Sequence, residues 1–152
     1  LVSVALSNQG GALALEPASP DNLGTVRPLR PGQTPSTNTH RTEATTLDEW
    51  VSAHELPQLD YLKLDAEGYE LNILRGGQTV LKQFTPKLFV EMDEGNLADY
   101  GATPGKLLGL LQELGYTFFW HMQQQRPVLP EEDFSGCHFD LLARPVSPQD
   151  AA

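Results

Sequence analysis

The sequence predicts an α/β fold, with a mostly parallel sheet that ends in an antiparallel pair of strands. Strand-like apolar runs at Leu59–Asp65 and Lys87–Met92 alternate with segments of helical periodicity, which is typical of parallel α/β sheets. The runs Tyr116–His121 and Cys137–Arg144 follow each other with no helical segment between them, which favours antiparallel neighbours. Hydrophobic residues make up 39% of the 152 residues and charged residues 20%, as expected for one globular domain.

The N-terminal third contains two expected strands and a long expected loop. Leu1–Ser7 alternates apolar and small polar residues, which predicts a strand. Gln9–Gly11 has turn chemistry, and Ala12–Glu16 is then expected to be a short second strand and a candidate hairpin partner of the first. Five of the twelve prolines lie within Pro17–Pro35, so this segment is expected to be a loop.

Helices are predicted from capping residues and from the spacing of apolar side chains. Thr46, three residues before Glu49, forms a capping box, and Thr103 caps a helix with Pro104 at its first position. The expected helices are Leu47–Leu56, Glu67–Arg75, Gln78–Phe84 and Pro104–Leu114. With the strands between them, these helices form one expected domain over residues 1–147, followed by a frayed tail over residues 148–152.

The charge balance and the cysteine count exclude several classes of function. Ten Lys and Arg against twenty Asp and Glu give a net charge of −10, which argues against a nucleic-acid partner and against binding to anionic membranes. No run of about eighteen apolar residues occurs, so no transmembrane helix is expected. The single cysteine, Cys137, allows no internal disulfide and no multi-cysteine metal site, and we therefore expect a reducing, cytoplasmic location.

Carboxylates gather where two expected strands end. Asp65 and Glu67 follow the strand Leu59–Asp65, and Glu91 lies within the apolar run of the next strand. Ligands of open α/β sheets bind at this edge, and paired carboxylates can serve as a base, orient an amine or hold a cation. The structural alternative is that Asp65 and Glu67 only cap the following helix. Asp93 and Glu94 are expected to continue into an ordinary acidic loop.

The segment Leu62–Gly76, LKLDAEGYELNILRG, resembles the signature of the FkbM-type methyltransferases, which use S-adenosylmethionine and have a seven-stranded Rossmann-like fold. The residues that fit this signature are Lys63, Asp65, Glu67, Gly68, Glu70, Leu74, Arg75 and Gly76. Further segments that resemble the family are Val4–Gly10, Thr45–Asp48, Pro86–Glu91, Leu111–Tyr116 and Phe139–Pro145.

The resemblance implies a methyl transfer from S-adenosylmethionine to an oxygen nucleophile, such as a hydroxyl of a sugar or another small molecule. It places Asp65 beside the transferred methyl group as base or orienter, with Glu67 and Glu91 on the acceptor side. The residues that it implies at the cofactor are Ala5, Leu6, Ser7, Asn8 and Asp65. No metal site is implied.

The chain differs from the family pattern at its N-terminal end. The family binds its cofactor with a Gly-rich turn after the first strand and an acid after the second, and neither is present. If Leu1–Ser7 is the third strand, roughly sixty residues in two strand–helix units are missing, and the chain is the C-terminal portion of such a domain. We then expect an inactive isolated chain whose exposed sheet edge, at Leu59–Asp65, favours homo-oligomers.

Two other functions stay open at this point. The chain can be a non-catalytic remnant or binding module without a cofactor site, which the missing Gly-rich turn favours. A weaker alternative is a divalent-cation hydrolase built on Asp65, Glu67 and Glu91.

Overall fold

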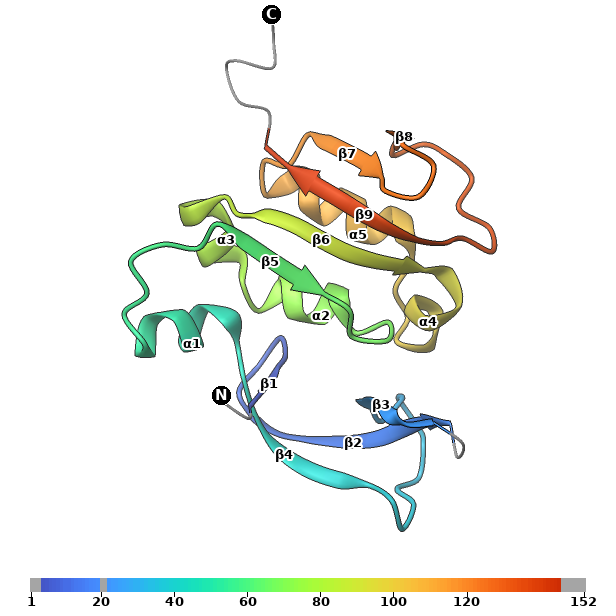
Figure 1. Cartoon of the computed structure of the whole chain (residues 1–152). Coiled ribbons are helices and arrows are strands. Elements are labelled where there is room, and N and C mark those ends of the chain that lie inside the picture. Colours follow the sequence, from blue (N-terminus) through green and yellow to red (C-terminus); the bar gives the residue numbers. More distant parts are fainter. Residues whose placement is uncertain (1–3, 20–21, 146–152) are drawn as a thin grey trace, which may run out of the picture.

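The computed structural model describes residues 4–19 and 22–145, which form two β-sheets and five helices (Figure 1). The larger sheet has the order β5 (Tyr61–Leu64), β6 (Lys87–Asp93), β9 (His138–Arg144), β7 (Phe118–His121) and β8 (Arg126–Pro127). The smaller sheet has the order β1 (Ala5–Leu6), β4 (His40–Thr45), β2 (Gly11–Ser19) and β3 (Asn22–Pro28). The helices are α1 (Leu47–Ala53), α2 (Glu70–Arg75), α3 (Gln78–Phe84), α4 (Glu94–Asp99) and α5 (Pro104–Glu113). The expected tail at residues 148–152 and the start of the first expected strand, residues 1–3, lie outside the described residues.

The larger sheet confirms the two strand pairs that the sequence predicts. β5 and β6 are parallel neighbours, and β7 and β9 pair antiparallel. β9 also pairs antiparallel with β6, so β5, β6 and β7 all run in the same direction with β9 between the last two. In the described part of the chain, only β5–β6 and β1–β4 are parallel pairs. The mixed α/β character is therefore shown, whereas a mostly parallel, Rossmann-like sheet is not confirmed.

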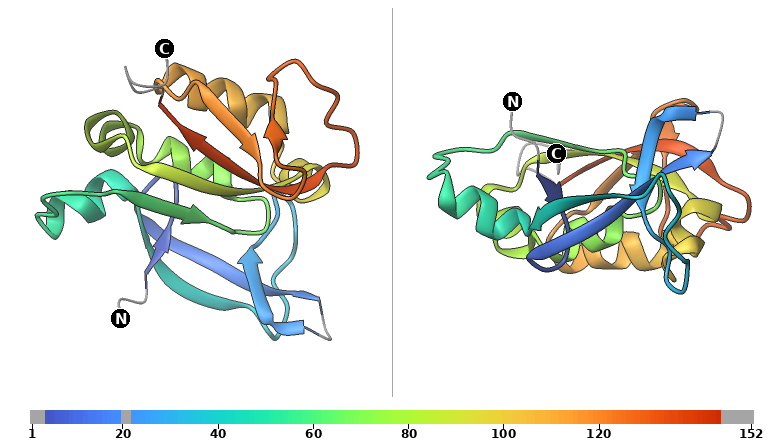
Figure 2. Two further views of the ribbon diagram at one scale, coloured as in Figure 1. Left: turned by 45° about the horizontal axis from the view of Figure 1, so that its top comes forward. Right: turned by 90° about the horizontal axis from the view of Figure 1, so that it is seen from below.

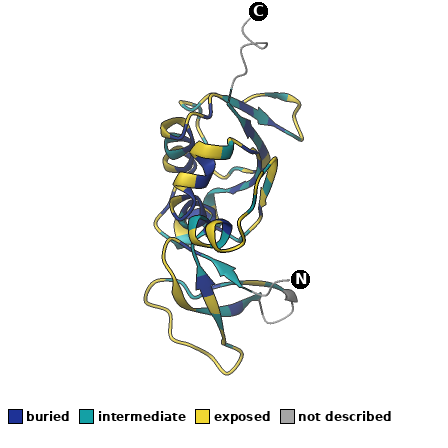
Figure 3. Cartoon of the chain, turned by 90° about the vertical axis from the view of Figure 1, so that its left-hand side faces the viewer, coloured by how far each residue is buried: buried dark blue, intermediate teal, exposed yellow. Residues whose placement is uncertain are grey.

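Helices α2, α3 and α5 cover one face of the larger sheet (Figure 2). Side chains of β6 and β9 alternate between buried and more exposed positions, so that Val90 and Leu141 point into the core under these helices. Leu74 and Leu107, from α2 and α5, are also fully buried in this core. Figure 3 shows the buried residues gathered between the helices and the sheet. No helix among the described residues covers the opposite face.

The smaller sheet overturns two expectations about the N-terminal third. The loop expected over Pro17–Pro35 is wrong up to Pro28, because β2 extends to Ser19 and pairs antiparallel with β3, whereas residues 29–35 have no regular secondary structure. Prolines are tolerated here because the register shifts between Pro17 and Ser19 and because β3 is an edge strand, where missing N–H donors cost little. β2 is also not a hairpin partner of β1. Instead β4, which sequence analysis missed, lies between them and pairs with both.

Contacts at the C-terminal end of α4, the helix that follows β6, hold the smaller sheet against the larger one. Asp99, at the end of α4, forms ion pairs of 3.1 Å and 3.0 Å with Arg27 and Arg30, which lie at the end of β3 and just after it. Tyr100 donates a hydrogen bond of 2.5 Å to the Pro28 carbonyl oxygen. These polar contacts hold β3 beside the C-terminal end of α4. Among the described residues, no helix has the length and apolar character needed to cross a bilayer.

The predicted capping box of α1 is confirmed, although the helix ends at Ala53 rather than near Leu56. Thr46 Oγ1 accepts a hydrogen bond of 3.0 Å from the Glu49 amide, and Glu49 Oε2 accepts one of 3.1 Å from the Thr46 amide. Leu47 and Val51 then pack against Val80 of α3.

Replacing Thr46 with alanine removes the acceptor for the Glu49 amide, so we expect the free energy of unfolding to fall by about 1 kcal/mol. Urea denaturation of the two proteins measures this loss. Thr46→Ser is the matched control, because it keeps the hydroxyl and should retain most of the stability. An equal loss in both variants would show that the methyl group of Thr46, rather than its hydroxyl, is responsible.

Candidate functional site

Two carboxylates lie side by side where β5 and β6 end. Leu64 and Val90 are register partners in the parallel pair, and both are buried toward the helices. The next residues, Asp65 and Glu91, therefore point to the opposite face, which no described helix covers. Glu91 is also the register partner of Asp140 on β9, so acidic side chains from three neighbouring elements share this face.

Glu91 is the carboxylate whose protonation is most perturbed. Burial is the main cause that raises its pKa to about 7, and the negative charges of Asp65 and Glu67 raise it further. Asp65, unlike Glu91, is exposed, and it forms a 2.8 Å salt bridge with Lys63. The same contact raises the pKa of Lys63. Neighbouring carboxylates with different environments are an arrangement in which one acid can act as a base near neutral pH.

The turn from Asp65 to Gly68 has an unusual backbone and packs closely on α4. Glu67 has a φ of 53° and Gly68 a φ of 95°, so two successive residues occupy the left-handed region. A Cβ atom on Gly68 would lie 2.1 Å from the Asn96 carbonyl oxygen. The Glu67 carboxylate accepts a hydrogen bond of 3.2 Å from the Asn96 side-chain amide. The Glu67 side chain and the backbone of the turn at Gly68 therefore both contact α4, and these contacts hold the turn in its conformation.

The interpretation of Asp65 and Glu67 as helix caps is wrong. The N-cap of α2 is Tyr69, and no side chain makes a cap hydrogen bond there. The expectation of an acidic loop after β6 is also wrong, because Asp93 caps the short helix α4 through a 2.7 Å hydrogen bond from the Asn96 amide. An aspartate at this position stabilises a helix start even where, as here, no apolar periodicity indicates one.

The comparison with protein families agrees with this geometry. A family model described as "Methyltransferase FkbM domain" matches residues 2–118, which include β5, the turn after it and β6. The chain belongs to the FkbM methyltransferase family. The match begins at residue 2, so the expectation that the chain is the C-terminal portion of such a domain is not confirmed. Comparisons with curated proteins and with solved structures gave no match.

In this FkbM-family chain, four of the five residues expected at the cofactor lie in or just after β1, and their positions differ. Leu6 packs against both hydrophobic clusters, and Ser7 is 3% exposed. Ser7 Oγ lies 3.0 Å from the Tyr69 hydroxyl, which joins the end of β1 to the turn after β5. Ala5 is half-buried in β1, and Asn8 is exposed. A role of these residues in cofactor binding stays a prediction. Asn8 is the most exposed of them, and its Oδ1 accepts a hydrogen bond of 3.2 Å from Ser7 Oγ.

Sequence reasoning missed Glu70 and Tyr69 as parts of the site. Glu70 fits the FkbM signature, but a glutamate in the first turn of a helix is usually a solvated residue, so nothing in the sequence indicates its burial. Tyr69 was indistinguishable from a core aromatic residue. Its role depends on β1 coming close to the turn, which only the tertiary structure reveals.

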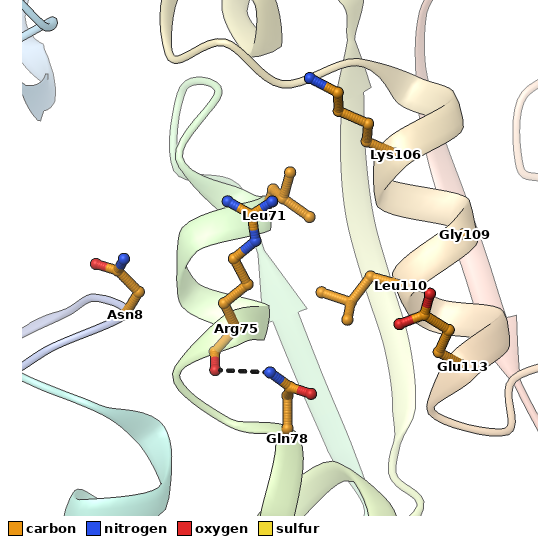
Figure 4. Close-up of a pocket in the computed structure, with 8 residues that line it drawn as sticks. All are labelled: Asn8, Leu71, Arg75, Gln78, Lys106, Gly109, Leu110 and Glu113. Carbon is orange, nitrogen blue, oxygen red and sulfur yellow. Dashed lines mark hydrogen bonds between the residues drawn. The ribbon is translucent and has the colours of Figure 1, made fainter.

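Two cavities lie near these residues, on opposite faces of the larger sheet. The larger, about 700 Å³, lies between α2 and α5 and includes Asn8, Arg75, Lys106 and Glu113 (Figure 4). The smaller, about 300 Å³, is lined by Lys63, Phe89, Met122 and Asp140 on the face of Glu91. We place the candidate site at the smaller one, because Asp65, Glu91 and Asp140 present their carboxylates on that face. Within the described residues, no group of three or more His, Cys, Asp and Glu is arranged to hold a metal ion.

The raised pKa of Glu91 predicts a pH dependence of stability. The folded protein binds a proton at Glu91 more tightly than the unfolded chain, whose pKa is near 4.5, so this group's contribution to stability falls as pH rises from about 4.5 to about 7. Glu91→Gln removes the contribution. We therefore expect the unfolding free energy of the variant, relative to that of the wild type, to increase across this window. A difference that stays constant with pH would contradict the raised pKa.

Proposed function

We propose that this chain catalyses the transfer of a methyl group from S-adenosylmethionine to a hydroxyl oxygen of a small molecule, such as a sugar, at the ends of β5 and β6. The family assignment supports a methyltransferase. The observation that carries the proposal is Glu91, a half-buried carboxylate with a pKa of about 7, next to Asp65 at the ends of two parallel strands. A base with this pKa is half deprotonated at neutral pH, which suits the removal of a hydroxyl proton.

The proposed mechanism gives each carboxylate a separate role. S-adenosylmethionine, when bound, supplies an electrophilic methyl carbon attached to a positively charged sulfur. Glu91 takes up the proton that the acceptor hydroxyl loses. Asp65, which forms a salt bridge with Lys63, and Glu67, which accepts a hydrogen bond from Asn96, orient the acceptor and favour a positively charged donor. Because the carboxylates form a negatively charged face, the residues present fit a cationic methyl donor.

The residue proposed to contact the methyl donor at this site is Asp65, whereas Asn8 lines the larger cavity on the opposite face of the sheet. Asn8 is exposed at the end of β1, while Ser7 is bonded to Tyr69 and connects that end to the Asp65–Gly68 turn. Ala5 and Leu6 would support this end of the strand rather than bind directly. A cytoplasmic location, inferred from the single cysteine, is part of the same proposal.

The test is a transfer assay with a radiolabelled methyl donor and a panel of hydroxyl-bearing acceptors, alongside amine and carboxylate acceptors. Labelled product from hydroxyl acceptors alone supports the proposal, and label on amines or carboxylates would contradict the acceptor class. Titration calorimetry with S-adenosylmethionine separates binding from turnover.

The second candidate is a binding module without catalytic activity. The observation that favours it is that Leu6 and Ser7, two of the residues expected at the cofactor, serve the core and the contact to Tyr69. No heat of binding with S-adenosylmethionine and no product with any acceptor would support this candidate.

We also propose that copies of the chain associate through the edge of the larger sheet. Among the described strands, β5 pairs only with β6, and Tyr61 on β5 is 59% exposed. Light scattering of the eluted protein measures the mass, and a monomer at all concentrations would contradict the proposal.

A further inference from the structure

Glu70 is a buried carboxyl group placed against the turn that carries Asp65 and Glu67. It is the first residue of α2 and is 1% exposed. One oxygen, Oε1, accepts hydrogen bonds of 2.8 Å from the Ala66 amide and 3.2 Å from the Gly68 amide. The other oxygen, Oε2, is buried and has no hydrogen-bond partner within the described residues. The side chain therefore uses a single oxygen to hold two backbone groups.

We propose that Glu70 is a positioning residue, whose Oε1 clamps the Asp65–Gly68 turn so that Asp65 and Glu67 stay beside Glu91. Its consequence for catalysis rests on the proposed methyl transfer, whereas its effect on the turn does not. The role is different from that of Asp65, Glu67 and Glu91, because Glu70 is buried and acts only through the backbone.

The turn needs such a clamp because its backbone conformation is unfavourable by itself. Glu67 is not a glycine, yet it has a φ of 53°, which a side chain with a Cβ rarely adopts. The conformation persists only where surrounding contacts determine it. Glu70 bonds the amides on both sides of Glu67, and Asn96 holds the Glu67 side chain from α4. Tyr69 adds a contact to Ser7 on β1.

Removing the acceptor leaves the Ala66 and Gly68 amides without a partner where the turn is packed against α4. The turn can satisfy these amides with water only by opening, and opening it moves Asp65 and Glu67 away from Glu91. The raised pKa of Glu70, which is caused mainly by burial, shows that this position is already unfavourable for a charge. An acceptor oxygen, rather than a negative charge, is thus the property that the turn requires.

A matched pair of variants separates the acceptor from the charge and from the volume. Glu70→Gln keeps a carbonyl oxygen at the position of Oε1, whereas Glu70→Met has the same unbranched length and no comparable acceptor. Both variants remove the ionisable group, so any direct effect of its charge on Glu91 is the same in both.

The first experiment measures amide hydrogen exchange in the two variants by NMR, with the whole chain. We expect the Ala66 and Gly68 amides to exchange at least about tenfold faster in Glu70→Met than in Glu70→Gln. The Leu81 amide, which donates to the Gly77 carbonyl oxygen at the start of α3, is the control for global unfolding and should exchange equally in both. Equal exchange of Ala66 and Gly68 in the two variants would overturn the proposal.

The second experiment measures methyl transfer. We expect kcat to fall by about tenfold to hundredfold in Glu70→Met, with a much smaller change in KM, and to stay near the wild-type value in Glu70→Gln. An equal loss in both variants would overturn the positioning role. If the wild-type chain shows no transfer, the proposed function fails, and the exchange experiment alone decides whether Glu70 clamps the turn.

Discussion

Replacing Gly68 with alanine is expected to lower the free energy of unfolding by about 2–5 kcal/mol. Two costs add at this position. A residue with a Cβ at a φ of 95° is strained by roughly 1–2 kcal/mol. The new Cβ would also lie 2.1 Å from the Asn96 carbonyl oxygen, and moving the backbone of α4 away costs roughly a further 1–3 kcal/mol. Urea denaturation followed by tryptophan fluorescence measures the sum.

Gly101→Ala is the control that separates the two costs. Gly101 has a φ of 69°, but a Cβ there would have no atom within 4 Å. This variant should therefore show only the backbone strain, of about 1 kcal/mol. If both variants lose the same stability, the contact between Gly68 and Asn96 contributes nothing, and the turn would not need to sit as close to α4 as it does.

The elements that sequence analysis predicts correctly are those whose cause is local. The capping box of Thr46 and Glu49 lies within four residues, and Pro104 starts α5 because its fixed φ suits the first helical position. The runs that form β5 and β6 are apolar enough to be recognised as buried strands, and their common direction follows from the helices between them.

The elements that it misses depend on contacts between distant residues. β4 has one buried apolar residue, Ala44, so its alternation gives almost no signal until it is placed between β1 and β2. The prolines of β2 and β3 suggest a loop, but the register shift after Pro17 accommodates them. β9, which lies between β6 and β7, brings a strand of opposite direction into a sheet that was expected to be mostly parallel.

In the candidate site, too, the features with a local cause could be predicted from the sequence, and those that depend on tertiary contacts could not. Asp65 and Glu91 could be predicted to lie together, because both follow from strand ends in one sheet. The sequence could not show that Glu91 is the more perturbed of the two, since burial causes most of the pKa change and burial is set by the fold. Glu70 was hidden for the same reason. Its hydrogen bonds go to the backbone of the preceding turn, and a glutamate in a first helical turn is ordinarily exposed.

The largest effect on activity is expected for Glu91→Gln, which should lower kcat for methyl transfer by about 10²–10⁴-fold. Glutamine has nearly the same shape but cannot take up the hydroxyl proton. The loss should not come from unfolding, because removing a half-buried carboxylate with a raised pKa does not destabilise the fold above neutral pH. In the wild type, kcat/KM should rise with pH and level off above about 7, since only the deprotonated Glu91 is active. In the variant this rise should be absent.

Asp140→Asn is the matched control for this prediction. Asp140 is the register partner of Glu91 on β9 and lies on the same face, so its removal changes the local charge without removing the proposed base. If general negative charge is what matters, the two variants should lose similar activity. If Glu91 accepts the proton, Asp140→Asn should keep the pH profile of the wild type, and a loss caused by the cavity that Asp140 lines should appear mainly in KM. A Glu91→Gln variant with an unchanged pH profile would assign the proton transfer to another group, such as Asp65 at the end of the neighbouring strand.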